Sequence, residues 1–148
     1  MKRLLYVIPV LVLILMLASC GNETVSIEDY EWKLRAVMKN DVDAAQDEDA
    51  LVIAVGENDE LYPDAKIVDV KLTAKNEKIT VVDSTNDKTY SGTYKQIEKT
   101  PDGITYEMEI DGKEGFATVS PTEHYEGTDV PTLPINMGEY SVYFIPAE

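Results

Sequence analysis

The sequence predicts an all-β domain of about eight antiparallel strands, arranged as an up-and-down β-barrel. Apolar and polar residues alternate with a period of two in most segments after Glu31, which is typical of strands with one buried face. Short turn signals separate these segments, which favours antiparallel hairpins. Eight such strands can close into a barrel, and closure removes the exposed sheet edges. The alternative is an open sandwich of two sheets.

The first predicted strand covers residues 31–39. Apolar side chains alternate along one of its faces: Trp32, Leu34, Ala36 and Met38. An acidic loop at 41–49 then leads to a second and more buried strand at 51–55. Residues 57–64 are polar and are predicted as a loop.

The middle of the chain predicts a meander. Its strands are 68–74, 79–82, 88–95, 104–110 and 114–120. Asn76-Glu77 is a predicted turn, and Asp111-Gly112 is a stronger one, because both central positions of such a hairpin need positive φ. Gly92 lies in mid-strand, where a barrel needs a bend or a bulge.

The end of the chain predicts a long loop and one more strand. Residues 121–134 hold His124 and three prolines, and they are predicted as the loop. Residues 139–145 form the last apolar strand, which would pair with the first strand to close the barrel.

The first twenty residues predict export. Lys2 and Arg3 precede an apolar run at 4–17, which is shorter than the roughly 20 residues of a transmembrane helix and is typical of a signal peptide. The residues at the end of this run, Leu17-Ala18-Ser19-Cys20, resemble the lipobox of bacterial lipoproteins and contain the only cysteine.

The lipoprotein resemblance implies cleavage between Ser19 and Cys20. It also implies a diacylglyceryl thioether on Cys20, with acyl chains such as palmitate. The protein would then be lipid-anchored at the extracytoplasmic face of the cell membrane, or of the outer membrane in a Gram-negative host. An ordinary secreted signal is the alternative. The predicted organisation is a signal peptide at 1–19, an anchor and tether at 20–30, and one β-barrel domain at 31–148.

Within the predicted tether, Ser26 and Asp29 have the spacing of a capping pair around one helical turn.

The composition is strongly acidic. The chain has 28 acidic and 13 basic residues and a formal net charge of −15, which becomes −17 once Lys2 and Arg3 leave with the signal. Such a charge is repelled by nucleic acid and by anionic headgroups, so neither is expected as a partner.

The predicted domain resembles the small lipocalin-like lipoproteins of bacteria in its architecture. The features shared are a tryptophan near the start of the first strand, Tyr90-Ser91-Gly92-Thr93-Tyr94, Asp111-Gly112-Lys113 and Tyr140-Ser141-Val142-Tyr143-Phe144. Lipocalins place a glycine two residues before that tryptophan, where this chain has Tyr30. The resemblance therefore implies a barrel and transfers no ligand.

No motif predicts catalysis, a metal or a cofactor. The only histidine, His124, has no Gly-x-Ser-x-Gly partner, and Cys20 is used by the anchor. One histidine without a free cysteine cannot build a zinc site. Acidic stretches at 41–49 and 57–60 are candidates for calcium, but the first lacks the glycine of an EF-hand loop. No pair of acids is marked as a glycosidase pair.

Aromatic residues are the last candidates. The residues predicted to line the barrel interior are Trp32, Tyr90, Tyr94, Tyr106 and Met108. They would either line a pocket for a small apolar ligand or fill the core. Three functions follow from the sequence. The first is a non-catalytic domain that binds an envelope protein, the second is a lipocalin-like carrier, and the third and weakest is a hydrolase with paired carboxylates.

Overall fold

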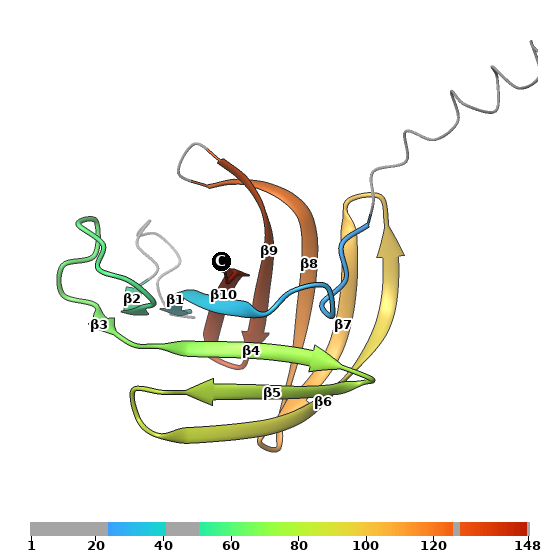
Figure 1. Cartoon of the computed structure of the whole chain (residues 1–148), viewed down its shortest axis with the longest axis horizontal. Coiled ribbons are helices and arrows are strands. Elements are labelled where there is room, and N and C mark those ends of the chain that lie inside the picture. The colour runs from blue at the N-terminus through green and yellow to red at the C-terminus, as the bar shows by residue number, and fades with distance from the viewer. Residues whose placement is uncertain (1–23, 41–50, 126–127, 148) are drawn as a thin grey trace, which may run out of the picture.

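The computed structural model describes residues 24–40, 51–125 and 128–147, and these residues form ten strands and no helix (Figure 1). The strands are β1 (Trp32–Lys39), β2 (Leu51–Val55), β3 (Lys66–Ile67), β4 (Val70–Lys75), β5 (Lys78–Asp83), β6 (Lys88–Thr100), β7 (Gly103–Ile110), β8 (Lys113–Tyr125), β9 (Thr128–Met137) and β10 (Tyr140–Pro146). The predicted all-β class is confirmed.

Eight of the strands close into an antiparallel barrel. β4 to β10 pair in chain order, and β1 lies between β4 and β10 and completes the ring. Trp32 pairs with Pro146 and Lys39 pairs with Tyr140, so the first and last strands meet along most of their length. The closed barrel is therefore confirmed over the open sandwich.

A fork in β1 places two strands outside the ring. Trp32 and Lys33 pair with β4, whereas the later part of β1, from Ala36 to Lys39, pairs with β2. β3 then pairs with β2 in parallel. We call residues 51–67 the arm, because they extend the sheet from β1 without joining the ring. The predicted burial of the strand at 51–55 is wrong for this reason, since only Val55 in β2 is fully buried.

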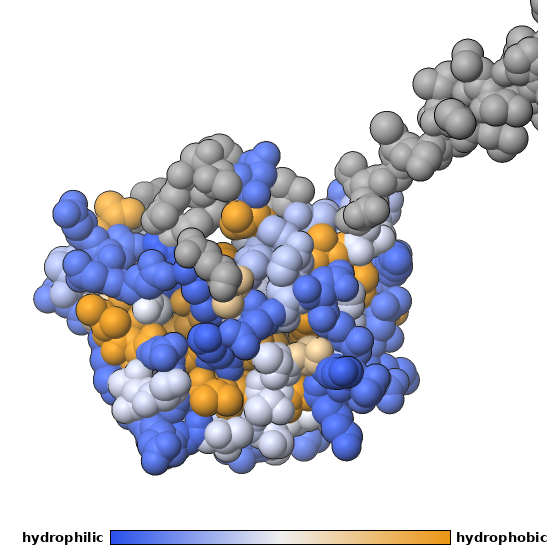
Figure 2. All heavy atoms as spheres, viewed as in Figure 1, coloured by the Kyte–Doolittle hydropathy of each residue, from blue (hydrophilic) through white to orange (hydrophobic). Residues whose placement is uncertain are grey.

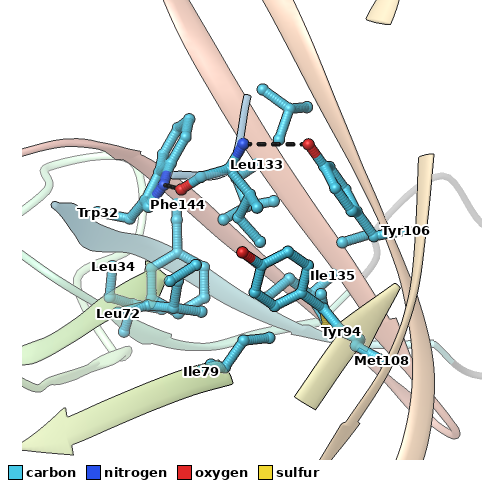
Figure 3. Close-up of a cluster of buried hydrophobic side chains, with 14 of the residues drawn as sticks. Trp32, Leu34, Leu72, Ile79, Tyr94, Tyr106, Met108, Leu133, Ile135 and Phe144 are labelled. Atoms are coloured by element: carbon cyan, nitrogen blue, oxygen red, sulfur yellow. Dashed lines mark hydrogen bonds between the residues drawn. The ribbon is translucent and has the colours of Figure 1, made fainter. Parts of the chain in front are cut away.

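Side chains from β1 and from β4 to β10 fill the barrel. The buried core residues are Ile27, Trp32, Leu34, Val68, Leu72, Ala74, Ile79, Tyr94, Ile104, Tyr106, Met108, Ala117, Val119, Leu133, Ile135 and Phe144. Figure 3 shows that the labelled side chains of this core point toward one another from several strands. Burial of this apolar surface is the main stabilising contribution to the barrel.

The predicted hairpin turns are confirmed. Asp111 and Gly112 have φ of 52° and 73°, and Asn76 and Glu77 have φ of 52° and 62°, so both turns use two left-handed residues. Gly92 has a different role from the predicted bulge. A Cβ at this position would lie 2.0 Å from the carbonyl oxygen of Glu109, so the glycine permits the close approach of β7.

The long loop predicted at 121–134 is wrong. Strand β8 continues to Tyr125, and β9 occupies most of the remaining residues. The prolines fit because they lie where the ladders are interrupted. Pro121 and Pro131 lie within the register shift that follows the pair Ser120–Thr132, and Pro134 lies in a gap of the β8–β9 ladder. No backbone N–H is needed at such positions.

Candidate functional site

The residues predicted to line the barrel interior divide into two groups. Trp32, Tyr94, Tyr106 and Met108 are buried in the core, whereas Tyr90 is half-buried and does not belong to it. The rings of Tyr94 and Tyr106 pack edge to face, with 5.6 Å between centroids and 78° between planes. The structure thus brings four of the five residues together, and they pack as part of the core (Figure 3).

The end of the barrel where the chain enters β1 also holds the β4–β5 and β6–β7 turns, and we call it the entry end. Residues 24–30, here called the N-terminal segment, pack against this end. Ile27 is 0% exposed and belongs to the core, and Val25 packs against the core. The sequence predicts this stretch as part of the tether, but its described residues are bound to the barrel.

Two aromatic side chains hold the main chain of Ile27. The indole Nε1–H of Trp32 donates to the carbonyl oxygen of Ile27 at 2.8 Å, and the N–H of Ile27 donates to the Oη of Tyr106 at 3.3 Å. The hydroxyls of Ser26 and Tyr106 lie 3.2 Å apart and share a hydrogen bond. Dashed lines in Figure 3 mark bonds of Trp32 and Tyr106.

Glu28 is bound from two sides. Its Oε1 accepts a hydrogen bond from the N–H of Asn76 at 2.9 Å and another from the hydroxyl of Tyr94. Burial, together with the nearby Glu28 carboxylate, raises the pKa of Tyr94 to about 12. The phenol therefore keeps its proton and acts as a donor at neutral pH.

The N-terminal segment also contains the turn predicted from Ser26 and Asp29. The N–H of Ser26 donates to Oδ2 of Asp29 at 2.7 Å, and the N–H of Asp29 donates to the carbonyl of Ser26 at 3.1 Å. The turn gives the segment the curvature that presents both Ile27 and Glu28 to the barrel.

Several depressions lie at the surface. One, of about 310 Å³, lies beside Tyr94 on β6 and β7 and is lined largely by exposed charged side chains. Another, of about 200 Å³, lies at the fork of β1 and includes Lys33, Glu57 and Lys71. Three charged groups of the second depression are paired, since Lys33 contacts Glu57 and Lys71 contacts Glu31, both at 2.8 Å.

The arm exposes apolar side chains. Leu61 is 79% exposed, Leu51 62% and Ile67 54%, and Ile53 and Tyr62 are also exposed. Figure 2 shows apolar side chains in orange among polar ones in blue, on the side of the molecule where β2 and β3 lie. The arm thus combines little burial with much apolar surface.

Ion pairs hold the arm to β1. Arg35 Nη2 lies 2.5 Å from Oδ2 of Asp59, and Lys33 pairs with Glu57. The N–H of Leu61 donates to Asp59, and this bond and the Arg35 guanidinium together lower the pKa of the Asp59 carboxyl. Gly56 is also required, because a Cβ there would lie 1.8 Å from the carbonyl oxygen of Leu34.

The predicted anchor and catalytic candidates are mostly outside the described residues. Ser19, Cys20 and the acidic loop at 41–49 lie outside them, and the structure describes His124 only as a backbone position in β8. Residues 57–60 belong to the arm, where two of the carboxylates bind cationic side chains.

Over the part of the chain that the structure describes, no three His, Cys, Asp or Glu side chains lie close enough together to hold a metal ion. Those same residues include no helix that would reach across a lipid bilayer.

Comparisons of the chain with protein-family models, with curated proteins and with solved structures find no match.

The sequence did not predict that Ile27 and Glu28 bind to the entry end of the barrel. The only signal is an isolated branched aliphatic residue within a polar stretch, Ser26-Ile27-Glu28, shortly before the first strand. That signal does not reveal that Tyr94 and Tyr106 will contact it, because these two residues lie about 65 to 80 positions further along the chain.

Proposed function

We propose that this chain is a membrane-anchored extracytoplasmic lipoprotein, and that its barrel is a non-catalytic domain that binds an envelope protein. The lipobox-like Leu17-Ala18-Ser19-Cys20 supports the anchor. The packed barrel interior favours binding at the surface over binding inside, because the described lining residues contact one another and the N-terminal segment.

The exposed apolar surface of the arm is the observation that carries the binding proposal. Large exposed apolar patches on a folded domain mark interaction sites. The patch is flanked by exposed acids, Glu57, Glu60 and Asp64. The partner surface that fits it is therefore apolar with basic side chains at its rim, since such a rim is complementary in charge.

A lipid anchor at Cys20 would leave the arm accessible to a partner. From Cys20 to Thr24 the extended chain spans at most about 14 Å. A lipid on Cys20 would therefore keep the entry end close to the membrane. The arm pairs with the later part of β1, which leads toward the other end of the barrel. It would face away from the membrane, where a partner can reach it.

Substitution in the arm tests the binding proposal. Leu61→Asp is expected to abolish cross-linking of the anchored protein to its envelope partner, whereas Val82→Asp, at an exposed position on β5, is expected to preserve it. The captured partner, once purified, should bind the wild-type barrel domain. The affinity of this binding should fall as the salt concentration rises, because salt screens the attraction between opposite charges. Equal cross-linking by wild type and Leu61→Asp would contradict the proposal.

Removal of the cysteine tests the anchor. Cys20→Ser is expected to leave the precursor uncleaved, with its apolar run at 4–17 still attached, and without a bound acyl chain. Processing and acylation identical to those of wild type would contradict the anchor.

A carrier of a small apolar ligand is the second candidate function. Trp32, Tyr94, Tyr106 and Met108 lie together in the interior and are the kind of residues that carrier pockets use, apolar walls with a few polar groups, but a ligand would have to displace their mutual packing. Native mass spectrometry of residues 21–148 from the host envelope tests it. A reproducible extra mass of about a few hundred daltons, lost on denaturation, would support the carrier, and a bare polypeptide mass would oppose it.

A further inference from the structure

We propose that the entry end of the barrel is a peptide-binding site, which the chain fills with its own residues 24–30. The ligand class is a short peptide that forms a turn and carries a branched aliphatic residue followed by an acid. Such a peptide would bind by displacing the N-terminal segment.

The contacts to the main chain are those of a receptor for a peptide. Both polar atoms of the Ile27 backbone, N and O, are bound by side chains of the barrel, Tyr106 and Trp32, and neither takes part in the sheet. These aromatic groups recognise an amide unit without regard to the side chain that it carries. If the segment left, the indole N–H and the phenol of Tyr106 would lose partners in a buried environment, and a buried donor without a partner is unfavourable.

The contacts to the side chains supply selectivity. Ile27 is fully buried among core residues, so a charged residue at its place would have to lose its hydration. Glu28 is bound by the hydroxyl of Tyr94 and by the N–H of Asn76, both of which are donors. The site therefore recognises an aliphatic residue that is followed directly by an acidic residue.

The segment is separable from the barrel. It contributes no strand. Apart from the bond from Trp32, five residues along the chain, the bonds that join Ser26, Ile27 and Glu28 to the barrel come from residues remote in the chain. A short stretch held in this way can open locally without unfolding the strands. A covalently linked copy acts at an effective concentration of about millimolar, so an added peptide competes only when the chain's own copy is weakened.

The test uses the chain from Gly21 to Glu148 with Ile27→Asp, which weakens the N-terminal segment. A synthetic peptide with the wild-type sequence of residues 23–30 is added, and the fluorescence of Trp32, the only tryptophan, is followed. The indole contacts the bound segment directly, and the peptide itself contains no tryptophan. A saturable change is expected with the variant, at an affinity at least about tenfold higher than with wild type.

Two controls make the result specific. A peptide with the same Ile27→Asp change is expected to give no saturable response. Adding Tyr106→Phe to the variant chain is expected to weaken binding of the wild-type peptide several-fold, because the hydroxyl that contacts the peptide backbone is removed.

Circular dichroism decides how a negative result is interpreted. If Ile27→Asp does not fold, Glu28→Ala replaces it, since this change removes only the exposed carboxylate. A folded variant that shows no saturable response up to millimolar peptide would overturn the proposal and leave the segment as a fixed part of the fold. This outcome does not bear on the proposed anchor or on the proposed binding surface of the arm. The anchor is tested by the processing of Cys20→Ser, and the arm is tested by the cross-linking of Leu61→Asp.

Discussion

The entry end and the arm are bound to the same first strand, but by different kinds of contact. At the entry end Ile27 is fully buried, and aromatic side chains satisfy its backbone. The arm attaches through ladder pairs, the partly exposed ion pair Lys33–Glu57 and the less exposed ion pair Arg35–Asp59, while Leu61 stays in solvent. Burial of apolar side chains contributes more than ion pairs near the surface, so we expect a tightly held entry end and a weakly held arm.

The largest expected effect compares Ile27→Ala with Leu61→Ala. The first change leaves a cavity in the core and should lower the free energy of unfolding by about 2–4 kcal/mol. The second removes an apolar side chain from solvent and should change it by less than about 0.5 kcal/mol. Urea denaturation followed by circular dichroism measures both. Equal losses for the two variants would contradict the difference between the entry end and the arm.

The next effect is alkaline loss of stability at the entry end. The folded chain holds the Tyr94 proton up to a pKa of about 12, above the ordinary value of about 10 for the unfolded chain. The raised pKa therefore contributes stability that is fully present below pH 10 and is lost as the pH rises from 10 toward 12. The loss is of the order of 2 kcal/mol.

Denaturation of wild type and Tyr94→Phe at pH 8 and pH 11 isolates this contribution, because all other groups titrate in both proteins. Wild type should lose more stability than Tyr94→Phe between the two pH values. Tyr140→Phe, at an exposed position on β10, is the matched control and should follow wild type. A parallel loss in wild type and Tyr94→Phe would show that burial and the contact with Glu28 do not hold the proton of Tyr94.

Much of the barrel could be predicted from the sequence because its signals are local. Alternation identifies β4, β5 and β7 nearly to their ends, and Asp111-Gly112 marks its turn by chemistry alone. The sequence predicts a loop only for the end of β8 and most of β9, where prolines interrupt the alternation. Proline opposes a continuous ladder, and only the pairing partners show where β8 and β9 have gaps.

The sites were harder to predict because they depend on contacts between remote residues. Alternation places Trp32, Tyr94 and Tyr106 inside, but it does not reveal that Ile27 occupies the space between them and the end of the barrel. The exposure of β2 was also missed. A run such as Leu51–Val55 is typical of a buried strand, and only the fork in β1 shows that it lies outside the ring.

A smaller effect concerns strain at the entry end. Glu77 has φ of 62°, a left-handed conformation that is unfavourable for a residue with a side chain. Glu77→Gly should therefore raise the free energy of unfolding by about 0.5–1 kcal/mol. Lys78→Gly, at the first position of β5, should lower it instead, because glycine there only adds freedom to the unfolded chain. Thermal unfolding distinguishes the two, and a loss of stability in Glu77→Gly would contradict the argument.

The smallest effect on global stability, and the most selective one, is acid release of the arm. The N–H of Leu61 and the Arg35 guanidinium lower the pKa of Asp59, so the contact with Asp59 stabilises the arm above the ordinary pKa of about 4 and is lost as the pH falls below it. Asp59→Asn imitates the protonated state at neutral pH. We expect it to accelerate chymotryptic cleavage after Leu61 while the melting temperature of the barrel is almost unchanged. Glu60→Gln, a neighbouring exposed position, should cleave as wild type does. If Asp59→Asn instead melts the whole domain, the arm is a cooperative part of the barrel, and the contrast with the entry end does not hold.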